Sequence, residues 1–592
     1  MAYTAFVSAA LWPRVLGVLA IALLASGIDD LIPLFICMAH RLGRRNRRVK
    51  PALGAQEVQR RIAIFVPCWK ESEVIGNMIR HNLAAVDYSN FDFFLGVYPN
   101  DPATVRVAEE LSGVYRNVHV ALCPNPGPTS KADCLNAIYA RMCTWEGENG
   151  AHFNTVVLHD AEDLIHPDAL SAINRERCRY AMVQVPVLPL PTPVSEFTHA
   201  IYCDEFAEFQ TIDMPARFYS GAFVPSNGVG TGFARHILQR LAQERPAIFN
   251  PASLTEDYEI GVYIHGIGHH QLFVPLQRGR HGLVATREYF PRRWKSAVRQ
   301  RTRWVTGIAL QSWERDGWRG SWRTKYWFWR DRKGLLTNPL SLTTNLLTIV
   351  GALTWGESSL HHHAWALSVN DPLVLRLCLY TSVLYAFRLS VRMFCVGRLF
   401  GYRFASALPL RVVFGNLINC AASCGALLRF ARAKVKGEPL VWLKTEHSYP
   451  EQQALLTRQR DLRDVLATSG LIAEDRLADL PAASGEDLLD LLHRDGLVTD
   501  EERCHALSLQ SGLASVQVNV REVKQNIVRT LPVHVEKRFG VVPFSVRNGR
   551  LLLAATRVPP PGIFDELRTY TRLPIELRLV TKGNYQELRR LL

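Results

Sequence analysis

At 592 residues the chain is too long for one ordinary domain, so we expect several, each large enough for its own core. The net charge of +15 predicts an anionic neighbour such as phosphate, nucleic acid or a membrane surface. The twelve cysteines are scattered, without a CxxC pair or the His/Cys spacing of a zinc site. The pattern therefore argues against a disulfide framework or a zinc domain and indicates mostly buried thiols in a reducing cytosol.

An apolar stretch at residues 11 to 38 is long enough to cross a bilayer, which takes about 20 residues. The basic block RRNRRVK follows at 44 to 50. The alternative is a cleaved signal peptide, but residues 25 to 27 make a poor cleavage site and Arg14 is the only leading charge. We predict a transmembrane helix and its basic flank over residues 1–50.

From 55 to 320 short apolar runs alternate with amphipathic stretches, which is typical of a mostly parallel α/β domain. The predicted central strands are RIAIFVP (61 to 67), FDFFLGVYP (91 to 99), VHVALC (118 to 123) and NTVVLHD (154 to 160).

Residues 321–444 contain three further apolar stretches, at 335 to 355, 372 to 394 and 412 to 431. The third carries polar residues and has arginine at both borders. Basic flanks on both sides favour the cytoplasm, so we expect this third stretch to lie along the membrane surface. The expected topology has an outside N-terminus, three spans and both large soluble parts inside. A fourth span would instead export the C-terminal domain.

Two carboxylates, Asp29 and Asp30, interrupt the first apolar segment. Charges within a bilayer are costly unless they are paired or lie near the headgroups. Arg388 and Arg392 in the third predicted span could pair with them, or the first span could simply end there.

Residues 445–592 are soluble and charged in composition. Two leucine-rich segments, at 462 to 477 and 488 to 503, share one spacing and predict a tandem helical repeat. A small α/β piece is expected to follow, with strands at 539 to 546 and 550 to 556 and a final helix.

Acidic side chains follow three of the predicted central strands. Glu71 follows the first and Asp101 the second, where they could hold the base and ribose of a nucleotide or simply cap helices. The fourth runs into Asp160, Glu162 and Asp163, carboxylates suited to Mg²⁺ or Mn²⁺ beside a diphosphate. An N-cap role for Asp163 is the alternative.

Two later segments supply the remaining groups that sugar transfer needs. Asp257, in Thr-Glu-Asp at a probable helix start, is the candidate general base, although a cap is its default role. In QRTRW, Gln300, Arg303 and Trp304 share one helical face, where they could bind phosphate and acceptor. A basic, aromatic helix at the membrane interface is compatible with that role.

Together, VPCWKE, SKADCLN, DAED, SNGVGTGFAR, TED and QRTRW resemble the membrane-bound family-two glycosyltransferases of the cellulose and hyaluronan synthase type. The resemblance implies a GT-A α/β fold at 55–320, inverting transfer of the hexosyltransferase type, a UDP-sugar donor and a divalent metal. It would place Glu71 and Asp101 on the nucleotide and Lys131 near the diphosphate. The usual DxD reads Asp160-Ala161-Glu162 here, so which carboxylates contact the metal stays open.

The stretch WLKTEHSYP at 442 to 450, the surface-helix candidate before it and the C-terminal part resemble the NfrB type of phage-adsorption transferase, which is linked to exopolysaccharide export. Residues 445–592 resemble the α+β MshEN domain, which in several members binds cyclic di-GMP through an arginine and a glycine early in each repeat. The corresponding positions here are Asp461 and Arg463, then Asp487 and Leu489. An aspartate is a poor substitute for a phosphate-binding arginine, so retained cyclic di-GMP binding is an open possibility.

The leading hypothesis is a glycosyltransferase of the bacterial inner membrane, with its catalytic and C-terminal domains in the cytoplasm. Its expected partners are a UDP-sugar, membrane lipids and an outer-membrane or periplasmic export partner. A catalytically weak, nucleotide-sensing scaffold is the alternative. Nucleic acid is not expected as a partner, because the arginines cluster beside apolar spans where anionic lipid accounts for them.

Overall fold

The computed structural model describes residues 2–44, 58–279, 282–365, 367–440, 486–547, 550–560 and 562–592, with Leu462 and Leu466. The predicted first helical repeat lies outside the described residues apart from those two leucines. Asp461 and Arg463 also lie outside them.

A seven-stranded sheet forms the centre of the large α/β domain, in the order β3-β2-β1-β4-β7-β5-β8. Its strands are β1 (Ile62–Pro67), β2 (Phe91–Val97), β3 (Val118–Leu122), β4 (Thr155–Leu158), β5 (Met182–Gln184), β7 (Thr231–Ala234) and β8 (Gln271–Phe273). The four predicted strands are confirmed, but β3, predicted to be central, lies at the edge of the sheet. The sheet is mixed, because β7 runs antiparallel to β4 and β5.

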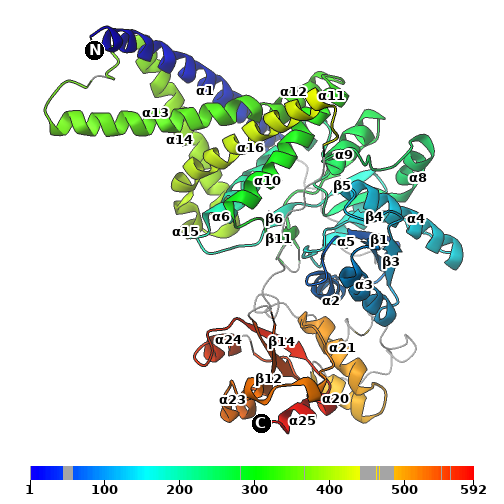
Figure 1. The fold of residues 1–592 in the computed structure, drawn as a ribbon. Coiled ribbons are helices and arrows are strands. Elements are labelled where there is room, and N and C mark those ends of the chain that lie inside the picture. Colours follow the sequence, from blue (N-terminus) through cyan, green and yellow to red (C-terminus); the bar gives the residue numbers. More distant parts are fainter. Residues whose placement is uncertain are drawn as a thin grey trace.

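Helices cover both faces of this sheet (Figure 1). In β1, Ile64 packs with α2 on one face and Phe65 with α4 on the other, since successive strand residues point in opposite directions. One layer has α2 (Ile75–Ala85), α3 (Pro102–Val114) and α5 (Ala169–Glu176); the other has α4 (Lys131–Asn149), α8 (Arg235–Glu244) and α9 (Glu256–Gly266). Short strands at the margin are β6 (Val187–Pro189), β9 (Arg278–Gly279), β10 (Gly282–Leu283) and β11 (Thr286–Glu288).

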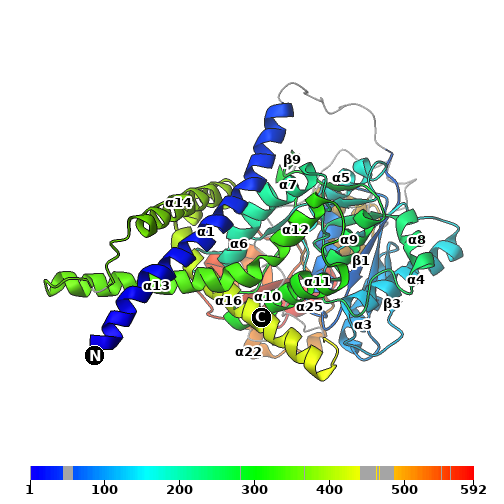
Figure 2. The ribbon, with the colours of Figure 1, turned by 90° about the horizontal axis from the view of Figure 1, so that it is seen from above.

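A second group of helices lies beside this domain (Figures 1 and 2). Those nearest the sheet are α6 (Phe197–Glu208), η1 (Phe209–Asp213), α7 (Met214–Tyr219), α10 (Trp294–Trp304), η2 (Val305–Gln311), α11 (Ser312–Asp316) and α12 (Trp322–Arg332). The longest are α1 (Ala2–Arg44), α13 (Gly334–Leu360), α14 (Pro372–Phe400) and α16 (Leu408–Lys436), with the short α15 (Tyr402–Ser406) before α16.

Within the described residues, three helices are long and apolar enough to cross a membrane, and they are α1, α14 and α16. The predicted span at 335 to 355 is a helix, α13, but its threonines and asparagines dilute its hydropathy, so it is not among the three. The helix expected on the membrane surface, α16, is among them. Length and composition thus select as many helices as the predicted spans, with α16 in place of α13, and which of the helices cross the membrane stays a prediction.

The packing of α16 nevertheless favours a surface position. One face of α16 is buried against α6, α10 and α13, where Arg411 and Ile418 are fully covered. The other face exposes Leu410, Leu417 and Leu428. A helix with one face on a folded domain and an apolar face outside is suited to the boundary between protein and lipid.

The aspartates of α1 pair with cations from two other helices. Arg388 of α14 contacts Asp30 at 2.5 Å, which confirms one predicted partner. Arg392 lies one turn further on and pairs with Glu208 at 2.5 Å instead, so the second predicted partner was wrong. Arg330 of α12 lies 3.1 Å from Asp29 and 3.0 Å from Asp30, and Lys333 contacts both.

The C-terminal domain has a three-stranded sheet, β12-β13-β14, that joins an antiparallel and a parallel pair. The two predicted strands and the final helix are confirmed. The elements are α20 (Glu486–Arg494), α21 (Asp500–Ser511), η3 (Val520–Glu522), α22 (Gln525–Val528), α23 (Val533–Phe539), β12 (Val541–Arg547), β13 (Arg550–Ala555), α24 (Ile563–Leu567), β14 (Ile575–Leu579) and α25 (Lys582–Arg589).

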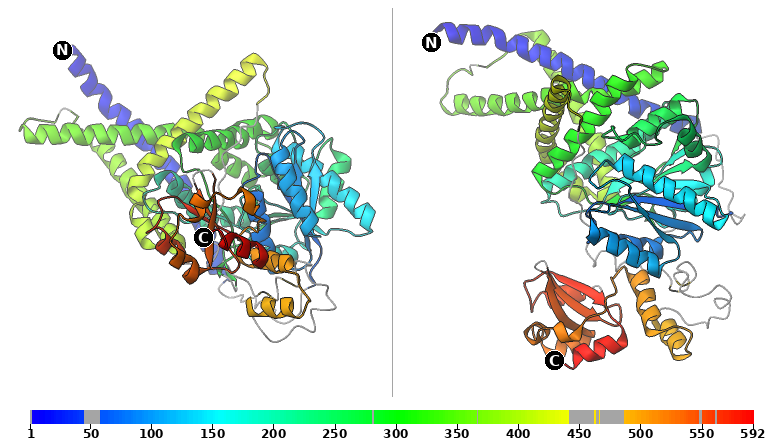
Figure 3. Two further views of the ribbon diagram at one scale, coloured as in Figure 1. Left: turned by 60° about the horizontal axis from the view of Figure 1, so that its bottom comes forward. Right: turned by 45° about the vertical axis from the view of Figure 1, so that its right-hand side comes forward.

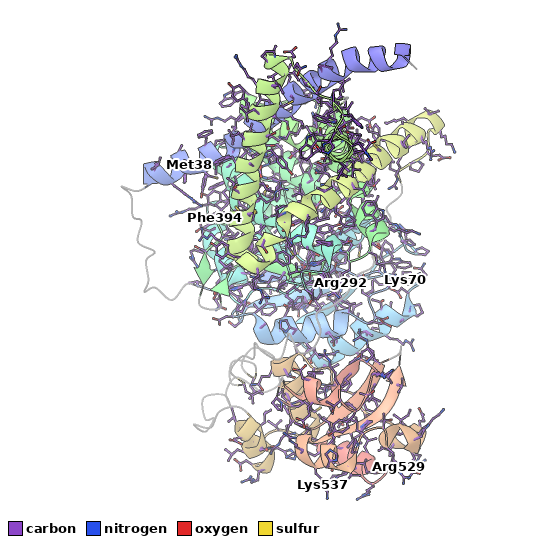
Figure 4. The ribbon with its side chains drawn as sticks, turned by 90° about the vertical axis from the view of Figure 1, so that its left-hand side faces the viewer. Met38, Lys70, Arg292, Phe394, Arg529 and Lys537 are labelled. Carbon is purple, nitrogen blue, oxygen red and sulfur yellow. The ribbon has the colours of Figure 1, made fainter. Side chains whose placement is uncertain are left out.

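This domain contacts the large α/β domain on the side away from the long helices, where α21 packs against α2 (Figures 1 and 3). Figure 4 shows the separation: Met38 and Phe394 lie among the long helices, and Lys537 and Arg529 lie at the opposite end.

Candidate active site

A cleft opens beyond the carboxyl ends of β1, β2 and β4. This is where ligands bind in open α/β sheets. Eight of the ten predicted site residues line it: Glu71, Lys131, Asp160, Glu162, Asp257, Gln300, Arg303 and Trp304. Asp101 and Asp163 lie outside its lining. Residues more than 230 positions apart in sequence, Glu71 and Trp304, therefore meet at one cleft.

Lys131 is the central cation of this cleft. It is the first residue of α4, whose start is capped by the Ser130 hydroxyl accepting from the Asp133 amide at 3.2 Å. Its Nζ lies 2.5 Å from Oδ1 of Asp160. Burial alone would lower the pKa of Lys131, but the surrounding carboxylates hold it above its ordinary value, so the ammonium stays charged.

Glu256 and Asp257 start helix α9 and face this ammonium. Burial raises the pKa of Glu256 to about 7, with a contribution from the charge of Asp257. Burial also raises the pKa of Asp257, while Lys131 and Arg303 oppose the rise. The pair can thus hold a proton near neutral pH, which suits a group that must accept one.

Gly228 brings the backbone close to both charged groups. Its φ of +79° belongs to the region that glycine tolerates, and its carbonyl accepts from Nζ of Lys131 at 3.5 Å. A Cβ at this position would lie 2.6 Å from Oδ2 of Asp257. The site therefore requires a residue without a side chain here.

We expect Gly228→Ala to lower kcat about 10- to 100-fold, because it would displace the Asp257 carboxylate. Steady-state kinetics of the purified variant would measure the effect. Gly150→Ala is the control, since it is also at positive φ but its Cβ would meet nothing within 4 Å. Equal kcat values in the two variants would contradict the expectation.

Glu71 and Asp101 have different positions although both follow strands. Glu71 is 5% exposed and lines the cleft. The Asp101 carboxylate instead accepts from the amide of Lys70 at 2.6 Å, behind the loop, and makes no side-chain cap of α3. Asp101 is therefore placed to hold the loop that carries Glu71, with Lys70 at a φ of +56°.

The carboxylates of the acidic cluster after β4 also have different positions. Asp160 and Glu162 line the cleft. Asp163 is fully buried and accepts from the amide of Asp160 at 3.0 Å, and its other contact is His159 at 2.7 Å. Because Asp163 lies outside the cleft lining and its Oδ2 is already held by this amide and by His159, it is poorly placed to bind a cation there. The alternative cap is absent too, because α5 begins after Asp168.

Two hard carboxylate oxygen donors at the cleft fit Mg²⁺ or Mn²⁺, which commonly bind one or two carboxylates and complete their shell with phosphate and water. Among the described residues, no three His, Cys, Asp or Glu side chains gather as a metal site. A cation would thus depend on a diphosphate for its remaining ligands.

Helix α10 forms the wall of the cleft opposite the sheet. Gln300, Arg303 and Trp304 line it together, as their helical spacing predicts. The helix continues into the π-helical segment η2, where a Cβ on Gly307 would lie 2.4 Å from the Thr255 hydroxyl. This close approach holds the wall against the loop that carries Asp257.

The sequence did not single out several other lining residues, including Trp69, Tyr98, Asn227, Glu256 and Phe290. Trp69, Asn227 and Glu256 lie within the motifs VPCWKE, SNGVG and TED, so their neighbours could have indicated them. Phe290 follows a margin strand and packs on Tyr202 at 4.8 Å, and no local pattern marks it.

The mixed sheet, the acidic cluster after β4 and the cleft at the strand ends define a nucleotide-sugar transferase fold of the GT-A class. The family model "Glycosyltransferase like family 2" matches residues 59–307. Bacteriophage adsorption protein B of Escherichia coli K12 is 32% identical over 570 residues, covering 91% of this chain and 76% of that protein. The N4 adsorption protein B of Escherichia coli O157:H7 matches equally.

The chain therefore belongs to the family-two glycosyltransferases, in the family of bacteriophage adsorption protein B. Its apolar helices associate it with a membrane. Among solved structures, a Pyrobaculum calidifontis mannosyltransferase in complex with GDP-Man and Mn²⁺ has 17% identity and a TM-score of 0.41 over 70% of this chain and 99% of its own. MshE with cdg has 19% identity and a TM-score of 0.19 over 23% of this chain and all of its own.

Proposed function

We propose that the protein transfers a hexose from a UDP-sugar, with inversion, to an acceptor hydroxyl at the cytoplasmic face of the inner membrane, in exopolysaccharide synthesis or export. The observation that carries the proposal is the convergence of Lys131, Asp160 and Asp257 in one cleft that the QRTRW helix closes.

In this reaction Asp257 accepts the proton of the acceptor hydroxyl as its oxygen attacks the anomeric carbon. The bond between that carbon and the diphosphate oxygen breaks, and UDP leaves with the bonding electrons. Lys131 and Arg303 supply positive charge for the departing diphosphate. Glu71 contacts the nucleoside, and Trp304 with Gln300 frames the acceptor.

Asp160 and Glu162 would hold Mg²⁺ or Mn²⁺. When bound, the cation would neutralise charge on the diphosphate. Asp163, the third predicted ligand, would then serve by fixing the amide of Asp160.

We expect kcat/KM to fall at acidic pH, on a limb that lies above the ordinary range of an aspartate. The acting base must be deprotonated, and burial raises the pKa of Asp257. In Glu256→Gln the repulsion between the two carboxylates disappears, so the acidic limb should move to lower pH. A pH–rate profile of both proteins would measure this, and identical limbs would contradict it.

The position of the C-terminal domain supports a regulatory role, because α21 packs against α2, the helix that follows the loop of Glu71. We propose that it is an MshEN-like regulatory domain and that an outer-membrane or periplasmic export partner takes the product. Cyclic di-GMP is the candidate effector.

The test is turnover by the full-length protein in detergent across a panel of UDP-sugars, with Mn²⁺, Mg²⁺ or a chelator, and with and without cyclic di-GMP. Metal-dependent transfer from one donor supports the proposal. Donor binding without turnover would favour the nucleotide-sensing scaffold, and the absence of donor binding would contradict both.

A further inference from the structure

Tyr258 follows the proposed base directly and connects it to a second carboxylate. The amide N–H of Tyr258 donates to Oδ1 of Asp257 at 2.8 Å, and its hydroxyl donates to Oδ2 of Asp331 at 2.7 Å. Because Tyr258 is 4% exposed, water does not compete for this hydroxyl. One residue therefore contacts the base through its backbone and Asp331 through its side chain.

Asp331 is itself held rigidly. Arg217 of α7 binds both of its oxygens, at 2.5 and 3.1 Å. The Arg217 side chain is 2% exposed and lies over the rings of Trp327 and Phe223, at 4.6 and 4.9 Å. A paired guanidinium between two aromatic rings has little freedom to move, so Asp331 is a fixed acceptor for the Tyr258 hydroxyl.

The turn of α12 that carries Asp331 is also fixed to the membrane helices. Arg330, one residue earlier, pairs with Asp29, and Lys333, two residues later, pairs with the same carboxylate at 2.7 Å. Figures 1 and 2 both show α12 between α1 and α9. The first turn of α9 is thus tied through α12 to a helix that enters the membrane.

We propose that Tyr258 and Asp331 are positioning residues that hold the Asp257 carboxylate at the acceptor hydroxyl. The inference rests on the proposed role of Asp257. A base acts only within hydrogen-bond reach of its proton, and a displacement of about 1 Å can cost about 100-fold in rate. Without the Tyr258 hydroxyl, the Arg217–Asp331 pair remains but no longer restrains the start of α9.

The test compares Tyr258→Phe with Tyr263→Phe in the full-length protein. Tyr263 lies on the same helix, and its ring packs under Arg245 at 4.4 Å, away from Asp331. We expect Tyr258→Phe to lower kcat about 10- to 100-fold with unchanged UDP affinity and Tm, and Tyr263→Phe to match the wild type. Asp331→Asn should lose a similar factor, and Asp331→Glu should recover part of it.

The inference is overturned if Tyr258→Phe keeps the kcat of Tyr263→Phe, or if kcat, UDP affinity and Tm fall together, which would indicate only a structural role. If Asp331→Asn does not fold, Tyr258→Phe alone still tests the inference, because that variant removes only one hydroxyl group. Failure of the proposed function differs from these outcomes, since the wild type would then be inactive or Asp257→Asn fully active.

Discussion

Asp257→Asn is expected to lower kcat by about 10²- to 10⁴-fold, the range for loss of a general base. The amide has nearly the same shape and can still pair with the Tyr258 N–H through its oxygen, but it cannot take up the proton of the acceptor hydroxyl. UDP binding should persist, because Lys131, Arg303 and Glu71 remain in the cleft. Turnover with the preferred donor, and UDP affinity by calorimetry, would measure the two effects separately.

The matched control is Asp565→Asn, the same chemical change at a side chain that is 68% exposed in the C-terminal domain. It should keep wild-type kcat. An Asp257→Asn variant that is folded, binds UDP and turns over at the wild-type rate would refute the assignment of the base.

Arg411→Met is expected to have the largest effect on stability. The Arg411 guanidinium donates twice to Asp204, both at 2.7 Å, and the two side chains are 0% and 4% exposed. Removing one partner leaves a buried, uncompensated carboxylate, which typically costs about 3–5 kcal/mol. Because this pair joins α16 to α6, the helix expected at the membrane surface should loosen from the catalytic domain. Tm and limited proteolysis within α16 would report the change.

The double variant Asp204→Asn with Arg411→Met should be more stable than Arg411→Met alone, because no unpaired charge remains. Lys434→Met is the control on the same helix, since its pairing with Glu314 is more than half exposed and should matter little. A single Arg411→Met variant with the Tm of Lys434→Met would contradict the expectation.

The buried strands β1, β2 and β4 could be predicted from sequence because strands buried on both faces are continuous apolar runs bounded by polar turns. The ends of these apolar runs also indicated which residues follow the strands. The direction of each loop side chain could not be predicted. Asp101 and Asp163 follow strands as Glu71 and Asp160 do, yet both turn back to bind loop amides, which depends on backbone angles that single residue types do not dictate.

The long helices show a second limit. The composition of a helix indicates whether it can enter lipid, but it does not indicate which other elements pack against it. The position of α16 therefore follows from its contacts with other helices, including α6 and α10. The partner of Arg392 was mistaken for a related reason. One turn of helix separates it from Arg388, and only the position of Glu208, nearly 200 residues earlier, decides which carboxylate each arginine meets.

The contacts of α12 with α1 and α9 set a limit on how far the protein could be shortened. A fragment that ends at residue 320 would retain all residues that line the cleft. It would lose Asp331 and the cations Arg330 and Lys333, which pair with Asp29 of α1. Under the proposed function we expect such a fragment to bind nucleotide yet transfer sugar poorly. A competent fragment would then have to extend through Lys333 and keep α1, so that a candidate membrane helix would also help to position the base.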